Sequence, residues 1–172
     1  MLKSGNIFLI GPMGTGKSTI GRQLAEKTGK HFYDSDQEIE QKTGATVSLI
    51  FEIEGEPGFR QRECKTIEEL SALKNIVLAT GGGAILSESN RECLKGNGTV
   101  IYLRSSVDTI LGRMAKDKQR PLLQTDDKEK KIRELLEQRV PIYEELADYS
   151  IDTDGYSVGQ MVKKLLQTLE LK

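Results

Sequence analysis

Residues 11–19 read GPMGTGKST, a loop that combines three glycines with a lysine and several hydroxyl groups. The loop matches the pattern G-x-x-x-x-G-K-[ST] at Gly11, Gly16, Lys17 and Ser18. An apolar run precedes it and a helical pattern follows it, which is the context that this pattern requires. Glycines let backbone N–H groups approach an anion, and the start of a helix adds a partial positive charge. The stretch therefore predicts a fold built around a phosphate-binding loop between a strand and a helix.

A nucleoside triphosphate with Mg²⁺ is the ligand that such a loop predicts. Lys17 can reach the outer phosphates, and Ser18 supplies the hydroxyl that such loops place on Mg²⁺. Further contacts with the nucleotide are expected from the loop and the helix start, at Gly14, Thr15, Gly16 and Thr19. The less favoured alternative is a glycine-rich turn with a surface lysine.

Five short β-prone runs alternate with helical spacing: NIFLI at 6–10, HFYD at 31–34, NIVLAT at 75–80, TVIYL at 99–103 and YSIDT at 149–153. Parallel strands need crossover connections, so this alternation predicts βαβ units. We expect one α/β domain over residues 1–172, a three-layer α/β/α fold of the P-loop NTPase type with a five-stranded parallel sheet. Ligands gather beyond the carboxyl ends of such strands, where the glycine loop, two aspartates and a triple glycine fall.

Composition describes an ordinary globular protein of 172 residues. The 25 basic side chains nearly balance 26 acidic ones, which argues against sequence-independent binding of nucleic acid. Cys64 and Cys93 are far apart and are expected to be free thiols in a reducing compartment. No run is long enough for a signal peptide or a membrane span, so we expect a cytoplasmic protein. The single histidine, His31, is expected at the surface where a strand opens.

Helical patterns fill the intervals between the strands. A turn at 55–58 leads into a helix with Ile67, Leu70 and Leu73 on one face, and a charged helix from about residue 127 to 140 is expected to end near Pro141. The stretch between Met114 and Asp127 is charged and without a period, which predicts a mobile loop. The chain closes on an amphipathic helix that carries Val162, Leu165, Leu166 and Leu169.

The string D-S-D places Asp34 and Asp36 two residues apart at the end of a predicted strand. With that spacing both side chains leave the same face of the sheet and can address one site. A structural alternative remains open, in which Ser35 or Asp36 caps the following helix and Ser35 forms a capping box with Glu38.

In these strings and their order, the chain resembles the shikimate kinase family over nearly its whole length. The resemblance rests on GPMGTGKST, FYDSD followed by IE, EGEPGFRQRE, VLATGGG and RPLL with an arginine in the helix beyond. It implies a small kinase with a mobile lid at about 114–127, which phosphorylates the 3-hydroxyl of shikimate with ATP and Mg²⁺ in aromatic amino acid biosynthesis.

The resemblance also implies residue roles. Asp36 accepts hydrogen bonds from the substrate hydroxyls and is placed to act as a base, while Asp34 supports Mg²⁺ mainly through water. Arg60 and Arg139 match the pair that clamps the substrate carboxylate, for which planar guanidinium forks are suited. Gly81, Gly82 and Gly83 match the turn whose backbone approaches the substrate ring.

Further roles concern the lid, the adenine base of the nucleotide and the cavity walls. Arg120 matches the lid arginine that swings over the phosphates, and with Lys17 and Asp36 it completes the residues expected in catalysis. Arg113 falls where the family places an arginine against adenine, and Asp154 falls in the region near the adenine base. Two phenylalanines, at 51 and 59, are expected either as apolar walls of the site or as core residues.

Two alternative functions remain. Another small P-loop kinase, acting on gluconate or on a nucleoside monophosphate, shares the loop and a lid but differs in the D-S-D, GFR and GGG strings. A nucleotide-binding regulator without transfer activity is the alternative of a different class. No exposed heptad seam is present, so we expect a monomer that binds a small molecule.

Overall fold

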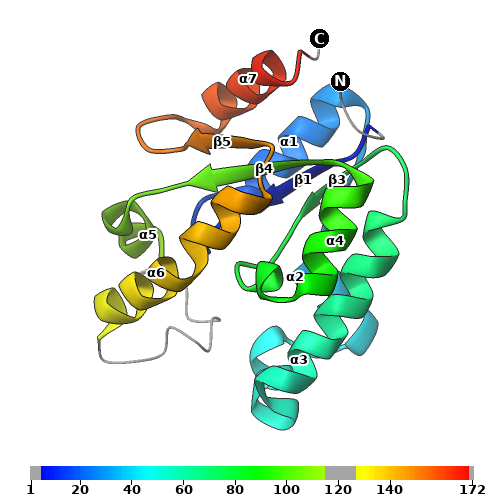
Figure 1. The fold of residues 1–172 in the computed structure, drawn as a ribbon, viewed down its shortest axis with the longest axis vertical. Coiled ribbons are helices and arrows are strands. Elements are labelled where there is room, and N and C mark those ends of the chain that lie inside the picture. Colours follow the sequence, from blue (N-terminus) through cyan, green and yellow to red (C-terminus); the bar gives the residue numbers. More distant parts are fainter. Residues whose placement is uncertain (1–4, 115–126, 171–172) are drawn as a thin grey trace.

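The protein contains a five-stranded parallel sheet with helices on both faces (Figure 1). The structure is a computed structural model that describes residues 5–114 and 127–170. The strands are β1 (Ile7–Ile10), β2 (His31–Asp34), β3 (Ile76–Ala79), β4 (Thr99–Arg104) and β5 (Tyr149–Asp152). Their order in the sheet is β2-β3-β1-β4-β5, and every neighbouring pair is parallel. All five predicted strands and the predicted fold class are confirmed.

The central strands are apolar throughout because both of their faces are covered. Ile7 and Leu9 of β1 pack on one side of the sheet with helices α1 (Lys17–Thr28) and α7 (Val158–Thr168). Phe8 and Ile10 point the other way, into a second core cluster. Because successive side chains of a strand alternate in direction, one short run supplies both cores.

The second core lies under α3 (Val47–Ser71), α4 (Glu88–Asn97) and α6 (Lys128–Leu146), which cover the opposite face of the sheet (Figure 1). The one-turn helix η1 (Ala84–Leu86) joins this layer, and α5 (Val107–Met114) packs on α6. Helix α2 (Ser35–Thr43) packs against the first part of α3 through Ile39, Ile50 and Phe59. The predicted three-layer arrangement is thus confirmed.

Helix α3 is longer than the sequence patterns predicted and is kinked at Gly55 (φ 72°, ψ 178°). The predicted turn at 55–58 is wrong in extent, because only Gly55 departs from helical geometry. Pro57 suits the first turn of the helical segment that follows, where the φ of proline is favourable and its missing N–H would have no partner. Ile67 and Leu70 are buried as predicted, whereas Leu73 lies beyond the helix end and is 40% exposed.

Helix α6 continues through Pro141 to Leu146, so the predicted end near Pro141 is wrong. The proline removes one helical hydrogen bond, but the turn beyond it carries Tyr143 and Leu146 into the core. The Tyr143 ring also stacks on Tyr102 of β4, with centroids 4.9 Å apart. Packing of this turn offsets the cost of the proline. The amphipathic face of α7 is confirmed, with Val162, Leu165 and Leu169 buried.

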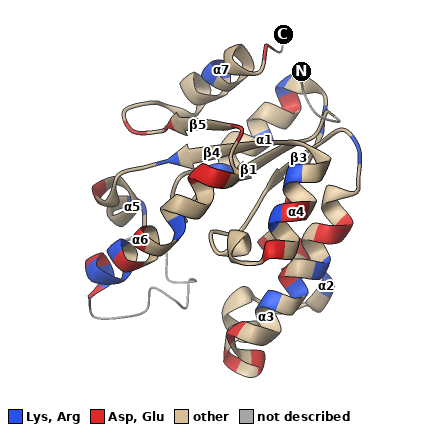
Figure 2. Ribbon diagram, in the orientation of Figure 1, with Lys and Arg blue, Asp and Glu red and all other residues tan. Residues whose placement is uncertain are grey.

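Charged side chains of both signs are interspersed over α3, α4 and α6, while the strands are mostly uncharged (Figure 2). Within residues 5–114 and 127–170, none of the helices combines the length and the apolar character that crossing a membrane requires. His31 is exposed at the start of β2, and Cys64 and Cys93 are free thiols, as expected. Most of the predicted loop at 114–127, with Arg120, lies outside the described residues.

Candidate active site

Two adjoining cavities open at the carboxyl ends of the strands. The first, of about 410 Å³, surrounds the glycine loop and the start of α1, and we call it the loop cavity. The second, of about 260 Å³, lies between α2, α3, α6 and the turn after β3, and we call it the α3 cavity. Five residues line both cavities and form their common boundary: Ser18, Asp34, Asp36, Gly81 and Gly82.

The glycine loop turns sharply between β1 and α1. Gly14 (φ 81°) and Gly16 (φ 85°) adopt the left-handed conformation that glycine tolerates best. At Gly11 a Cβ atom would lie 2.5 Å from the carbonyl oxygen of Leu103 on the neighbouring strand, so no larger residue fits there. The Nζ atom of Lys17 donates to the carbonyl oxygens at 11 and 12, both at 2.8 Å. The loop thus wraps around its own lysine at the edge of the loop cavity.

Asp34 connects the loop to α2. Its Oδ1 atom accepts a hydrogen bond from Gln37 N (3.1 Å) and so caps α2, while its Oδ2 atom accepts one from the Ser18 hydroxyl. The structural alternative, in which Ser35 or Asp36 caps α2, is therefore wrong. Asp36 belongs to the first turn of α2 rather than to the strand, so the predicted alternation along a strand is also wrong. The turn of the helix nevertheless brings both carboxylates to the boundary of the cavities.

The Ser18 hydroxyl and the Asp34 carboxylate are hard oxygen donors in direct contact, a set that fits Mg²⁺. Mg²⁺ commonly takes one or two carboxylates and completes its octahedral shell with water and phosphate oxygens. Among the residues that the structure describes, no group of three or more His, Cys, Asp and Glu side chains could hold a metal. The donors present thus suit an ion that shares its coordination with a bound phosphate.

Two glycines of the turn after β3 leave room for side chains of the site. A Cβ atom on Gly81 would lie 2.8 Å from Oδ1 of Asp36, and one on Gly83 would lie 2.3 Å from Nη2 of Arg60. A Cβ atom on Gly82 would lie 3.3 Å from Met13 N, a tighter contact than usual, and 3.5 Å from Nη1 of Arg139, which is an ordinary contact distance. At Gly81 and Gly83 a larger residue would therefore displace Asp36 or Arg60 in the α3 cavity.

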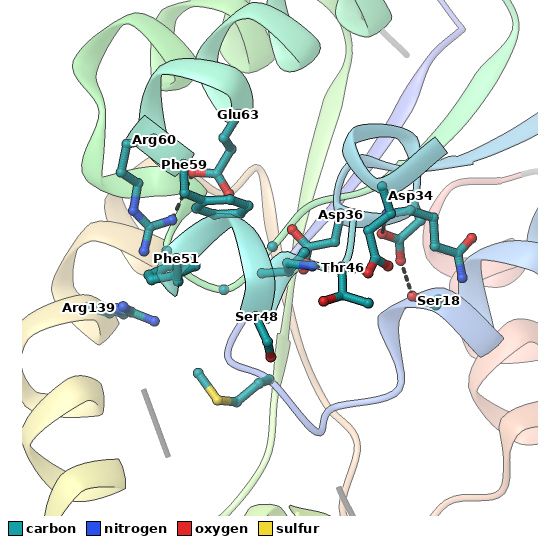
Figure 3. A pocket seen from close by; sticks show the side chains of 17 residues that line it. Ser18, Asp34, Asp36, Thr46, Ser48, Phe51, Phe59, Arg60, Glu63 and Arg139 are labelled. Carbon is teal, nitrogen blue, oxygen red and sulfur yellow. Dashed lines mark hydrogen bonds and ion pairs between the residues drawn. The ribbon is translucent and has the colours of Figure 1, made fainter. Parts of the chain in front are cut away.

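Arg60 of α3 and Arg139 of α6 line the α3 cavity, with Asp36 between them and the Ser18–Asp34 pair in Figure 3. Arg139 is 3% exposed, which is unusual for arginine. Arg60 is held by ion pairs to Glu63 (2.8 Å) and to Glu56 (3.2 Å). The cavity thus presents two oriented guanidinium groups, which suit a carboxylate ligand.

Phe59 and Phe51 also line the α3 cavity, with ring centroids 4.7 Å apart. Phe59 is at the same time a core residue, 3% exposed and packed with Ile39 and Ile50. Both predicted roles of this phenylalanine, cavity wall and core, therefore hold together.

Glu63 is a residue of the α3 cavity to which the sequence analysis assigned no role. It is 1% exposed, and burial raises its pKa from 4.5 to about 7, although the nearby Arg60 guanidinium opposes this shift. The Asp36 carboxylate raises the pKa of Glu63 further. Two sequence signals could have found it: Glu63 ends the string EGEPGFRQRE, and it lies three residues after Arg60, on the same face of a helix.

The far side of the loop cavity is formed by residues from α5 and from the chain after β5. Arg113 donates from Nη1 to the Gly14 carbonyl oxygen (2.7 Å) and so lies against the loop. Thr153 and Tyr156 line this cavity and were not predicted. Asp154 instead accepts a hydrogen bond from Ser106 N (3.1 Å) and is not a lining residue.

The structure brings the predicted site residues together wherever it describes them. The loop cavity is lined by Gly14, Thr15, Gly16, Lys17, Ser18, Thr19 and Arg113, and the α3 cavity by Arg60, Gly83 and Arg139. Asp34, Asp36, Gly81 and Gly82 line both. Arg120 lies outside the described residues.

Comparison with known proteins gives consistent matches. The model of the family described as shikimate kinase matches residues 13–170. The shikimate kinase of Chromobacterium violaceum is 54% identical over 166 residues, which is 96% of this chain and 90% of that protein. A solved structure of shikimate kinase from Acinetobacter baumannii in complex with shikimate has a TM-score of 0.95 at 52% identity, covering 96% of this chain and 93% of that one. A gluconokinase from Sinorhizobium meliloti covers 97% of this chain and 92% of its own at 19% identity, with a TM-score of 0.58, and shares the fold alone.

Proposed function

The chain belongs to the shikimate kinase family, and we propose that it transfers the γ-phosphate of ATP to the 3-hydroxyl of shikimate in aromatic amino acid biosynthesis. Membership in this family implies a kinase that uses ATP, as the sequence predicted. The observation that supports the acceptor is the α3 cavity, in which two arginines from different helices face a carboxylate at the boundary with the loop cavity.

The loop cavity is the proposed ATP site. Its glycine loop and the start of α1 supply backbone N–H groups and a partial positive charge to the phosphates, and Lys17 carries a full charge. To bind a phosphate, the Lys17 ammonium must exchange its contacts with the loop carbonyls at 11 and 12. Arg113 is proposed to lie against adenine. Bound Mg²⁺ would be held by Ser18 with the support of Asp34, and would supply charge neutralisation at the transferring phosphate.

The α3 cavity is the proposed site for shikimate. Arg60 and Arg139 would bind its carboxylate, and the backbone of Gly81, Gly82 and Gly83 would lie against its ring. Asp36 would then accept hydrogen bonds from the ring hydroxyls and take up the proton of the attacking one. Phosphoryl transfer depends mainly on position and charge neutralisation, and the place of Asp36 between both cavities meets that requirement.

Arg120 is proposed to act on the transferring phosphates from the segment between α5 and α6. An arginine in this role can stabilise the transition state by a factor of about 10³ or more in kcat. Closure of such a segment over the site would also exclude water and so limit hydrolysis of ATP.

The small size of the α3 cavity favours a small acid over a second nucleotide. It measures about 260 Å³, against about 410 Å³ for the loop cavity, which is the proposed site of a whole nucleotide. This disfavours a nucleoside monophosphate kinase. Gluconate is also a small acid with a carboxylate, so the size of the cavity does not distinguish it from shikimate. The match to a gluconokinase, however, is far weaker than the matches to shikimate kinases.

We propose further that the protein acts as a cytoplasmic monomer without nucleic acid or membrane partners. The interspersed charges seen in Figure 2 support the absence of a binding face for nucleic acid. Sedimentation equilibrium should give a single species near the chain mass of 19.2 kDa.

Release of ADP, measured in a coupled assay with ATP and Mg²⁺, tests the proposed function. Shikimate should stimulate release by at least about 100-fold over the rate without acceptor, whereas gluconate and AMP should not. Stimulation by gluconate or AMP instead would assign the alternative kinase. A slow hydrolysis that no acceptor changes would assign a nucleotide-binding regulator.

A further inference from the structure

The glycine turn at 81–83 carries no side chains and therefore cannot fix its own position. Backbone bonds from Ala84 N to Gly81 O (3.1 Å) and from Leu86 N to Gly83 O (3.2 Å) shape the turn itself. Because successive glycines have many accessible conformations, contacts from other elements are what fix its place in the fold. At its ends the turn is tied to the fold, because Thr80 N donates to Leu9 O (3.1 Å) and Asn90 Nδ2 donates to Ala84 O (2.9 Å). Between these anchors two side chains hold the peptide groups of the turn itself.

Ser35 holds the first peptide group. Its hydroxyl accepts a hydrogen bond from Gly81 N (3.0 Å), and the serine is completely buried. Ser35 lies between Asp34 and Asp36 at the start of α2. The hydrogen bond therefore connects the glycine turn to the residue next to the proposed base.

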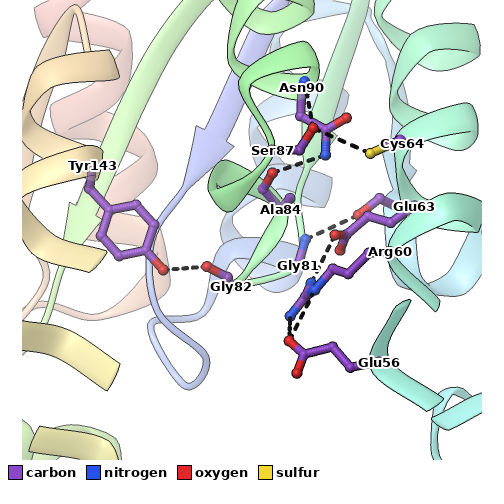
Figure 4. A network of polar contacts seen from close by, with 11 residues as sticks. Glu56, Arg60, Glu63, Cys64, Gly81, Gly82, Ala84, Ser87, Asn90 and Tyr143 are labelled. Atoms are coloured by element: carbon purple, nitrogen blue, oxygen red, sulfur yellow. Dashed lines mark hydrogen bonds and ion pairs between the residues drawn. The ribbon is translucent and has the colours of Figure 1, made fainter. Parts of the chain in front are cut away.

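Tyr143 holds the second peptide group from the opposite side. Its hydroxyl donates to Gly82 O at 2.5 Å (Figure 4). The Tyr143 side chain is completely buried, and its ring stacks on Tyr102. Tyr143 lies on α6, one helical turn after Arg139. The hydrogen bond therefore connects the same turn to the element that carries a proposed carboxylate ligand.

We propose that Ser35 and Tyr143 are positioning residues that set the spacing between Asp36 and Arg139 through the glycine turn. The inference rests on the proposed function, because it gives these residues an effect on the binding of shikimate. Neither residue lines the loop cavity or the α3 cavity. Ser35 acts through the turn, and Tyr143 acts through the turn and through its side-chain hydrogen bond with Arg139. A substrate fixed at its carboxylate and at its ring hydroxyls requires a constant distance between the two anchoring points.

Two conservative variants test the inference. Tyr143→Phe and Ser35→Ala should each raise the KM for shikimate about five- to tenfold, with the KM for ATP unchanged within about twofold. Calorimetry without nucleotide should show the same loss of shikimate affinity, while the affinity for ADP stays constant. The two residues lie on different helices and hold different peptide groups. If one variant fails to fold, the other therefore still tests the inference.

Tyr102→Phe and Ser71→Ala are the matched controls. Each removes a hydroxyl from a buried residue that does not contact the turn: Tyr102 is the other ring of the stack, and Ser71 donates to Glu68 O at the end of α3. Both controls should keep the shikimate affinity of the unmodified protein.

A merely structural role would lower the melting temperature of Tyr143→Phe and Ser35→Ala but leave their shikimate affinity within about twofold of the controls. That result would overturn the inference while the proposed function stands. If the unmodified protein neither bound nor phosphorylated shikimate, the proposed function would fail and the inference with it.

Discussion

Asp36 is the residue on which the proposed chemistry depends most directly. It stands at the boundary of the two cavities, where an acceptor hydroxyl and a terminal phosphate would meet. We predict that Asp36→Asn lowers kcat by about 100-fold or more, because an amide cannot take up a proton, while ADP affinity is preserved. The coupled assay gives kcat, and calorimetry gives the affinity.

Asp34→Asn is the comparison for this variant. Asparagine can still cap α2, so the helix start is retained, but the neutral amide is a weaker ligand for Mg²⁺. This variant should require more Mg²⁺ for half-maximal activity. Loss of nucleotide affinity in Asp36→Asn, with an unchanged Mg²⁺ requirement in Asp34→Asn, would reverse the two assignments.

Glu63 predicts a dependence of stability on pH. Burial raises its pKa from 4.5 to about 7, and the charges that face it are Arg60 of its own helix, Asp36 of α2 and Arg139 of α6. Because the folded state favours the neutral acid, this contribution to stability is complete below about pH 4.5 and is lost as pH rises through about 7. The two pKa values differ by about 2.5, which corresponds to a loss on the order of 3 kcal/mol.

Glu63→Gln measures this contribution, because glutamine is a neutral side chain of the same shape. Urea unfolding at several pH values from 4.5 to 7.5 gives the free energy of unfolding of both proteins. As pH rises, the free energy of unfolding of Glu63→Gln should increase relative to that of the unmodified protein. A constant difference over this range would mean that Glu63 keeps an ordinary pKa in the folded protein.

Residues that we propose to bind charged groups could be predicted in two ways. A phosphate loop needs glycines and a lysine, so the loop pattern alone predicted Lys17. Only the resemblance to the shikimate kinase family predicted Arg60 and Arg139, because an arginine taken by itself is usually a surface residue. Glu63 and Tyr143 were not predicted, because an isolated glutamate or tyrosine on a helix is usually a surface or core residue. Their importance comes from contacts with distant segments, such as the bond from Tyr143 to Gly82.

At the level of elements, apolar runs predicted the central strands β1, β3 and β4 because buried parallel strands are apolar on both faces, whereas the edge strands β2 and β5 are more exposed and more polar. The helices were less predictable where proline and glycine occur. Pro141 was taken as a helix end, but burial of the next turn keeps α6 continuous. Near Gly55 the opposite happens, since a sequence with little periodicity becomes two helical segments joined by a kink.

Gly55→Ala should destabilise the protein by about 1–3 kcal/mol. The glycine has φ 72° and ψ 178°, a conformation that is nearly restricted to glycine, and a Cβ atom there would still find room, 3.6 Å from Pro57 Cδ. The cost is therefore backbone strain rather than collision. Because the kink directs Phe59 and Arg60 to the α3 cavity, shikimate affinity should fall as well.

Gly96→Ala is the control for this substitution. Gly96 lies in α4 with no atom within 4 Å of its Cβ position, and its φ is not in the left-handed region. Alanine should therefore stabilise the helix by up to about 1 kcal/mol. Urea unfolding of both variants compares them directly, and equal effects of the same sign would contradict the strain at Gly55.

For the whole molecule, the order of the strands determines how the two cavities meet. The order β2-β3-β1-β4-β5 places the loop after β1 beside the glycine turn after β3, and the start of α2 follows β2 at the same edge. Segments more than 60 residues apart in the sequence, such as the loop at 11–19 and the turn at 81–83, thereby share one boundary. The sequence predicted that these segments follow strands, but not which strands are neighbours.

This arrangement predicts that the two ligands stabilise the protein through different residues. Lys17 lines only the loop cavity and Arg139 only the α3 cavity. A ligand at about 100 times its Kd stabilises the folded state by about 2.7 kcal/mol, which is roughly 5–10 °C for a chain of this length. Lys17→Ala should lose the shift caused by ADP with Mg²⁺ and keep the shift caused by shikimate.

Arg139→Ala should show the reverse pattern, with the shikimate shift lost and the ADP shift kept. Both variants remove contacts of a nearly buried side chain, so each ligand shift is measured from the melting temperature of the same variant without ligand. The comparison is then insensitive to a general loss of stability. If either substitution abolished both shifts, the two cavities would behave as a single site, and the division of the molecule between nucleotide and acid would be wrong.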